Sequence, residues 1–134
     1  MGIKFSGGVP RTKVTVNDKK GAPVGVGSFI VDTGASESSI SSAEFPGGNF
    51  DAAGVVVFEV AGPGGTPSLV SMTKVKGGSM TFMVTPAAGG NEVPVTCTMP
   101  MIIGSINLLG NDQLGATGAI LHWNAKTKSG FLHL

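Results

Sequence analysis

Short apolar runs alternate with clusters of glycine, proline and polar residues along most of the chain. Apolar and polar residues alternate over residues 13–16, and longer apolar runs cover residues 24–31, 55–60 and 80–84. Alternation and short apolar runs of this kind are typical of β-strands, and turn-forming residues at 17–21 separate the first two. The pattern therefore predicts a series of strands joined by tight turns.

The rest of the chain continues this pattern and adds one short helix. The further predicted elements are strands at residues 69–72, 93–97, 101–103, 119–123 and 131–134, and a helix at residues 107–114. Pro94 cannot donate a hydrogen bond to a neighbouring strand, so its run is predicted to lie at a sheet edge. Many short strands with a single helix indicate an all-β fold.

The composition favours one folded domain over residues 1–134. The 22 glycines and 8 prolines suit many turns, and a hydrophobic content of 41% is too high for a disordered chain. A chain of 134 residues is long enough for one modest core. We expect residues 1–11, which precede the first clear strand pattern, to form a flexible arm.

Charge and cysteine content narrow the possible partners and location. A net charge of +1 gives no electrostatic reason to expect binding to nucleic acid or to an anionic membrane. Cys97 is the only cysteine, so the chain cannot form an internal disulfide, which suits a reducing compartment. No segment has the pattern of a signal peptide or a membrane span. We therefore expect an intracellular protein.

An acid stands at the end of the apolar run 29–31, where Asp32 is followed by Thr33 and Gly34. A buried carboxylate is costly unless it is paired or hydrogen-bonded. The small residues that follow leave backbone N–H groups free to approach this carboxylate and to tune its proton affinity. A simple Asx turn after a strand uses the same residue types, so the tripeptide alone leaves a structural and a catalytic role open.

Two motifs together resemble those of the retropepsin-like aspartic proteases, the half-length relatives of pepsin made by retroviruses and retrotransposons. Residues 30–35 (IVDTGA) match the acid loop of that family. The second family motif, two hydrophobic residues and a glycine, is matched by Ile102, Ile103 and Gly104. The C-terminal segment 115–134 is most similar to gypsy-class retrotransposon proteases.

The resemblance implies a closed, half-pepsin barrel with a flap hairpin and one short helix near the C-terminus. It also implies an aspartic endopeptidase that is active as a homodimer, without cofactor or metal, because each subunit supplies one acid loop. Asp32, Thr33 and Gly34 would form the catalytic loop, and the paired aspartates would activate a water to hydrolyse an extended peptide or polyprotein. The expected location is the cytoplasm or a virus-like particle.

The resemblance also implies substrate-binding and subunit-interface residues. Substrate contacts are expected at Ala35, Ser36, Gly62, Pro63, Gly64 and Gly65, the last four at the flap tip. The dimer interface is expected at Thr33, Phe131, Leu132, His133 and Leu134. In the alternative interpretations, the flap is an ordinary surface hairpin and the terminal strand closes the core of its own subunit.

The sequence departs from the retroviral pattern at one pair of positions. Many retroviral members carry an acid two residues after the loop glycine and an arginine after the glycine of the second motif, whereas this chain has Ser36 and Ser105. The alternative function is that of a catalytically weak, retropepsin-like dimerisation or peptide-binding module. A third interpretation is an unrelated β-barrel binding domain, which we would expect to be a monomer. A nucleophile–histidine or zinc site is disfavoured, because His122 and His133 both lie in the terminal strands.

Overall fold

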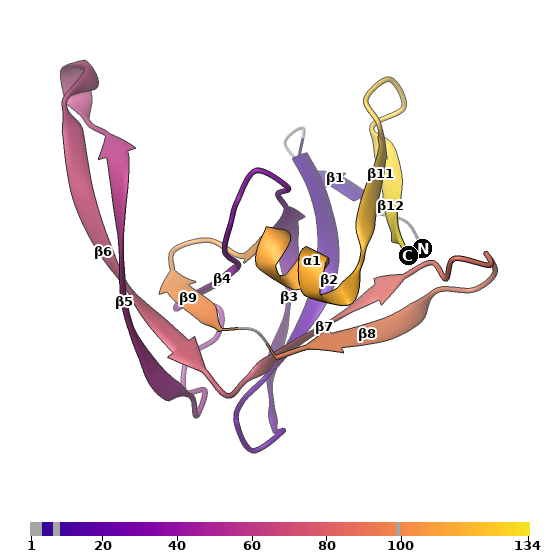
Figure 1. The fold of residues 1–134 in the computed structure, drawn as a ribbon, viewed down its shortest axis with the longest axis horizontal. Coiled ribbons are helices and arrows are strands. Elements are labelled where there is room, and N and C mark those ends of the chain that lie inside the picture. The colour runs from indigo at the N-terminus through magenta and orange to yellow at the C-terminus, as the bar shows by residue number, and fades with distance from the viewer. Residues whose placement is uncertain (1–3, 7–8, 99) are drawn as a thin grey trace.

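The computed structural model describes residues 4–6, 9–98 and 100–134 and consists mostly of β-strands (Figure 1). The elements are β1 (Lys4–Ser6), β2 (Val9–Asn17), β3 (Pro23–Val31), β4 (Ser39–Ser41), β5 (Asp51–Ala61), the 3₁₀ turn η1 (Pro63–Gly65), β6 (Pro67–Lys76), β7 (Ser79–Val84), β8 (Val93–Cys97), β9 (Met101–Gly104), β10 (Leu108–Leu109), α1 (Asn111–Thr117), β11 (Ile120–Asn124) and β12 (Ser129–His133). The predicted all-β class is confirmed. No helix in the described part of the chain is long and apolar enough to cross a membrane.

Ten strands form one sheet, and β11 and β12 form a separate hairpin. The order in the sheet is β5-β6-β9-β4-β10-β3-β2-β7-β8, with β1 paired to β2. The prediction of a closed barrel is therefore wrong, because β5 and β8 end the path without pairing to each other. Pro94 lies in β8, as predicted for an edge strand, and a proline there cannot donate to a further neighbour.

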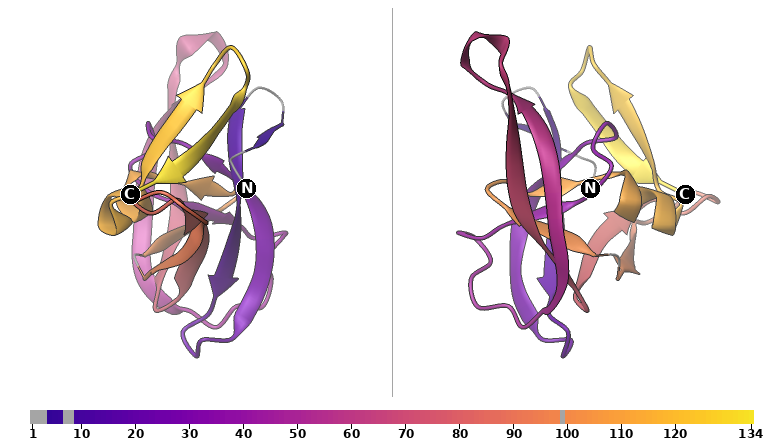
Figure 2. Two further views of the ribbon diagram at one scale, coloured as in Figure 1. Left: turned by 90° about the vertical axis from the view of Figure 1, so that its right-hand side faces the viewer. Right: turned by 60° about the vertical axis from the view of Figure 1, so that its left-hand side comes forward.

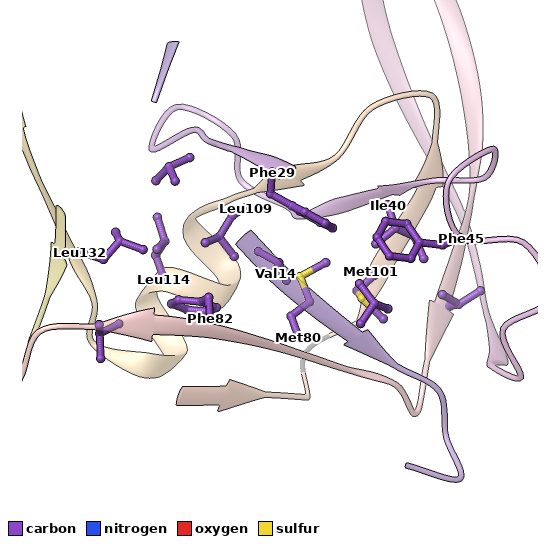
Figure 3. Close-up of a cluster of buried hydrophobic side chains, with 14 residues drawn as sticks. Val14, Phe29, Ile40, Phe45, Met80, Phe82, Met101, Leu109, Leu114 and Leu132 are labelled. Atoms are coloured by element: carbon purple, nitrogen blue, oxygen red, sulfur yellow. The ribbon is translucent and has the colours of Figure 1, made fainter. Parts of the chain in front are cut away.

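The core lies between the sheet and α1 and is built by alternation along the strands (Figure 3). In β3 the side chains of Phe29 and Val31 are buried, whereas Ile30 between them is only half-buried. Val14 of β2 and Phe82 of β7 pack into the same cluster. Because side chains alternate along a strand, Ser28, Ile30 and the following Asp32 lie on the face of β3 that points away from the core.

The predicted helix begins four residues later than expected. Leu108 and Leu109 belong to β10, and α1 begins at Asn111 after Gly110, whose backbone is extended at φ −97° and ψ −178°. The helix is capped by Gly118. This glycine adopts the left-handed conformation, with φ 74°, that most other residues avoid. The pattern of residues 107–110 is compatible with a helix or with a strand. Leu108 and Leu109 form a strand because they pair with β3.

The expected flexible arm is only partly present. Lys4–Ser6 pairs antiparallel with residues 9–11 at the start of β2, so these residues are strands rather than a loose arm. Residues 1–3 and 7–8 lie outside the described residues.

The C-terminal hairpin is confirmed, and its last strand attaches to the sheet through Thr85. The Thr85 amide donates to Leu132 O at 2.8 Å, and the Leu134 amide donates to Thr85 O at 2.9 Å. Leu132 is 2% exposed and belongs to the core, whereas Phe131 is 37% exposed and Leu134 is 39% exposed. The terminal strand therefore closes the core through Leu132 alone.

We predict that Leu132→Ala destabilises the protein by about 2–5 kcal/mol, because it opens a cavity in the core beside β7. The matched control Leu69→Ala removes the same atoms from a side chain that is 75% exposed, and it should change the free energy of unfolding by less than about 1 kcal/mol. Urea denaturation at equal protein concentration measures both. Similar losses in the two variants would contradict the placement of Leu132 in the core.

Candidate active site

Asp32 follows β3 directly and is held by the backbone around it. Its amide donates to Leu109 O at 3.0 Å, which continues the pairing of β3 with β10 by one residue. Its carboxylate Oδ1 accepts a hydrogen bond from the Gly34 amide at 2.9 Å. The Ala35 amide donates to Asp32 O at 3.2 Å and completes the turn. Asp32 is half-buried, whereas Thr33 and Gly34 are exposed at the tip of the loop.

The position of Gly34 leaves little space for a side chain. A Cβ added there would lie 3.2 Å from Asp32 Oδ1. The small residue after the acid therefore lets a backbone N–H approach the carboxylate closely, as the sequence predicted.

The acid loop is closed around β10, the short strand that lies between β3 and β4. Leu108 and Leu109 pair in parallel with Ile30 and Val31 on one side. On the other side, Leu108 pairs antiparallel with Ser39 of β4. The strand that enters the loop and the strand that leaves it are thus joined through the same two-residue segment.

Gly110 packs directly against the backbone of the acid loop. A Cβ at this position would lie 2.9 Å from Ala35 O and 2.8 Å from Glu37 O, so no other residue fits without a backbone shift. Asn111 then contacts the loop twice: its amide donates to Ala35 O at 2.8 Å, and its side-chain Nδ2 donates to Thr33 O at 2.6 Å. The first residue of α1 therefore holds the backbone of the acid loop by two hydrogen bonds.

A buried serine and the first acid of α1 lock the next part of the loop. Ser38 is fully buried, and its amide and hydroxyl both donate to the Asp112 carboxylate, at 3.0 Å and 2.7 Å. The Ser38 hydroxyl also accepts from the Gly110 amide at 2.8 Å. Asp112 therefore has a structural role, since it holds the segment that follows the acid loop.

The structure brings Leu108, Leu109 and Gly110 to the acid loop, rather than the predicted second motif Ile102, Ile103 and Gly104. The predicted motif forms β9, which pairs in parallel with β4 and antiparallel with β6. Two strands, β4 and β10, separate it from β3 in the sheet.

The sequence signal for the segment that reaches the loop was present but missed. Leu108, Leu109 and Gly110 are also two hydrophobic residues and a glycine, and they directly precede the helix. With this alignment, the residue that follows the motif glycine is Asn111 rather than Ser105, and it contacts the loop through a neutral amide.

The predicted hairpin over residues 55–72 is present and projects from the body of the protein (Figures 1 and 2). Its tip is the turn η1, where Gly64 and Gly65 have positive φ angles of 72° and 80°. The Gly62 amide donates to Thr66 O at 2.7 Å and closes the turn. The tip residues Gly62, Pro63, Gly64 and Gly65 thus lie together in one turn, and their role in substrate binding stays a prediction.

The base of this hairpin is fixed by two ion pairs. Lys74 of β6 donates to the Glu37 carboxylate, a half-buried pair that ties the hairpin to the segment after the acid loop. Lys19 donates to Asp51 of β5 at 2.8 Å, and this hydrogen bond lowers the pKa of the Asp51 carboxyl below its usual value. The hairpin is therefore anchored at its base and exposed toward its tip.

Most other acids of the chain serve local contacts. Glu37, Glu44, Asp51 and Asp112 accept from the side chains of Lys74, Asn107, Lys19 and Ser38, respectively, and Asp18 accepts from two backbone amides of its own turn. Asp32 is the one acid presented on an exposed Asp-Thr-Gly loop in the described part of the chain. A two-carboxylate reaction would therefore need a second copy of this loop.

Neither a comparison with protein-family models nor a comparison with curated proteins finds a match to this chain. The interpretation of the site consequently depends on its motif and on its geometry.

We predict that Asp112→Ala and Ser38→Ala each destabilise the protein by about 1–3 kcal/mol, because each leaves buried hydrogen-bonding groups without a partner. Their effects should not add in the double variant, because both substitutions break the same contact. Asp18→Ala serves as a control in an exposed turn and should cost less than about 1 kcal/mol. Additive losses, measured by chemical denaturation, would contradict the proposed lock.

Proposed function

We propose that the protein is an aspartic endopeptidase that acts as a homodimer, with one acid loop from each subunit. The observation that carries this proposal is the presentation of Asp32. A glycine amide holds its carboxylate, β10 and α1 brace the loop that carries it, and the residues beside it are exposed. A turn with a merely structural role would not need this support from three elements.

The chemistry requires two carboxylates that share one proton. One acts as a general base on water, and the other donates a proton toward the carbonyl oxygen of the scissile bond. Two identical chains related by a two-fold axis bring Asp32 next to its own copy, because such an interface uses the same surface on both sides. Thr33, exposed at the loop tip, then faces its counterpart.

The β5–β6 hairpin supports an extended peptide as substrate. A peptide that lies between a floor and a hairpin can form strand-like hydrogen bonds along its backbone. Val57 of β5 and Leu69 of β6 are exposed and offer apolar contacts on the arms of this hairpin. The glycines at the tip allow its backbone to approach a bound peptide closely.

The outer face of the C-terminal hairpin supports association with a second copy. Ile120 and Phe131 are exposed there, and His122 stacks on Phe131 with ring centroids 4.9 Å apart. Exposed apolar side chains grouped on one face favour an interface. The side chain of Leu132 is buried in the core of its own subunit and is not part of this exposed face.

We predict that Asp32→Asn lowers kcat/KM for peptide hydrolysis at least about a thousandfold and leaves the melting temperature and the dimer unchanged. Asparagine keeps the shape of the side chain and the hydrogen bond from Gly34 but cannot take a proton from water. Cleavage of a mixed peptide pool, followed by mass spectrometry at acidic and neutral pH, measures the loss. Turnover close to that of the native protein would end the aspartic-protease proposal, and no turnover in the native protein would favour the binding module.

We predict that Phe131→Ser weakens the dimer at least about tenfold, because it removes the central aromatic side chain of the exposed face. The control Val57→Ser changes a more exposed apolar side chain on β5 and should leave the dimer intact. Sedimentation velocity over a range of concentrations gives the dissociation constants. Equal dissociation constants in the two variants would place the subunit interface elsewhere.

A further inference from the structure

A hollow opens on the same face of the sheet as the Asp32 carboxylate. Side chains alternate along a strand, and Phe29 and Val31 point into the core, so Ser28, Ile30 and Asp32 point to the opposite face. Ser28 and Ile30 line the hollow, which has a volume of about 210 Å³. Ile30 is two residues from Asp32, a separation of about 7 Å along an extended strand. The hollow therefore lies about two residues' length along the strand from the proposed reaction centre.

The lining of this hollow includes a cation, Arg11. Arg11 of β2 is paired directly with Ile30 of β3, so the two side chains emerge next to each other. The Nε of Arg11 is buried and has no hydrogen-bond partner among the described residues. Arg11 also lines the hollow, so its guanidinium group can donate hydrogen bonds to a ligand that supplies an acceptor oxygen.

The lining of the hollow also includes an anion, Glu44. Glu44 lines the hollow, and its carboxylate accepts a hydrogen bond from the Asn107 side chain. Among the described residues, Glu44 and Arg11 do not form an ion pair with each other. Both charged groups therefore line the same hollow without neutralising each other directly. Ile30 and Ile106 supply apolar surface between them.

This combination selects for a side chain that is both an acceptor and a donor. A carboxamide has a carbonyl oxygen for Arg11 and an NH₂ group for Glu44, and its methylene stem suits the apolar wall. A carboxylate would satisfy Arg11 but would face the charge of Glu44. An ammonium group would satisfy Glu44 but would face Arg11, and a purely apolar side chain would leave Arg11 without an acceptor.

We propose that this hollow binds the glutamine or asparagine side chain of an extended peptide, next to the bond that Asp32 cleaves. The inference depends on the proposed function for the position of the bond, but the chemical selectivity of the hollow follows from Arg11 and Glu44. In a two-fold dimer each subunit supplies one such hollow, so a carboxamide is preferred on both sides of the scissile bond.

The experiment uses four eight-residue peptides that are identical except for Gln, Glu, Met or Lys at both central positions. The native protein should show a kcat/KM for the Gln peptide about 10- to 100-fold higher than for the Met peptide. Arg11→Met should reduce this preference to about twofold or less, and Glu44→Gln should raise the activity on the Glu peptide at least about fivefold. Lys13→Met is the matched control: Lys13 pairs with Ser28 on the same face but does not line the hollow. It should keep the preference for Gln.

Binding to the Asp32→Asn variant separates this inference from the proposed function. If no peptide is cleaved but this variant binds the Gln peptide at least tenfold more tightly than the Met peptide, the hollow is selective and the proposed function fails. If peptides are cleaved or bound without preference for Gln, the inference is wrong. If Arg11→Met weakens the dimer while the peptide preference is unchanged, Arg11 belongs to the subunit interface and the inference is also overturned.

Discussion

The acid loop depends on one close backbone contact, the packing of Gly110 against the carbonyl groups of Ala35 and Glu37. This contact is possible only because position 110 has no Cβ. It lets β10 run between the strands that enter and leave the loop, and it places Asn111 and Asp112 where their polar groups reach the loop backbone. The loop therefore owes its shape to residues about seventy positions further along the chain.

Support of this kind has a physical purpose at a site that presents a carboxylate. A loop of small residues has little side-chain surface of its own and many conformations in the unfolded chain. The contacts from Asn111 and from the Ser38–Asp112 pair replace the missing side-chain packing with directed hydrogen bonds. Directional bonds also limit the orientation of the carboxylate, which catalysis by paired acids requires.

Local patterning predicted the individual elements well, because alternation and turn residues act over a few positions. The strands of the β2–β3 hairpin, the edge position of Pro94 and the C-terminal hairpin all follow from such signals. The partner of the acid loop could not be chosen in this way, since two similar apolar-glycine motifs lie within nine residues of each other. Which one pairs with β3 is decided by long-range register.

Neither the open form of the sheet nor the hollow beside Asp32 could be predicted from the sequence, for a related reason. Closure depends on whether the edges β5 and β8 meet, and neither edge carries a local signal for its partner. The hollow joins Arg11, Ile30, Glu44 and Ile106, which are far apart in the chain and individually unremarkable in composition. Only the register of β2 on β3 places Arg11 beside Ile30.

The terminal strand β12 carries two kinds of information on alternate residues. Leu132 faces the core, and Phe131 and His133 face outward, so a slip of one residue would exchange the buried set and the displayed set. Two backbone bonds with Thr85, the residue after β7, tie β12 to the sheet at a defined position. The backbone at position 85 therefore helps to fix which side chains of the C-terminal strand the molecule shows to its surroundings.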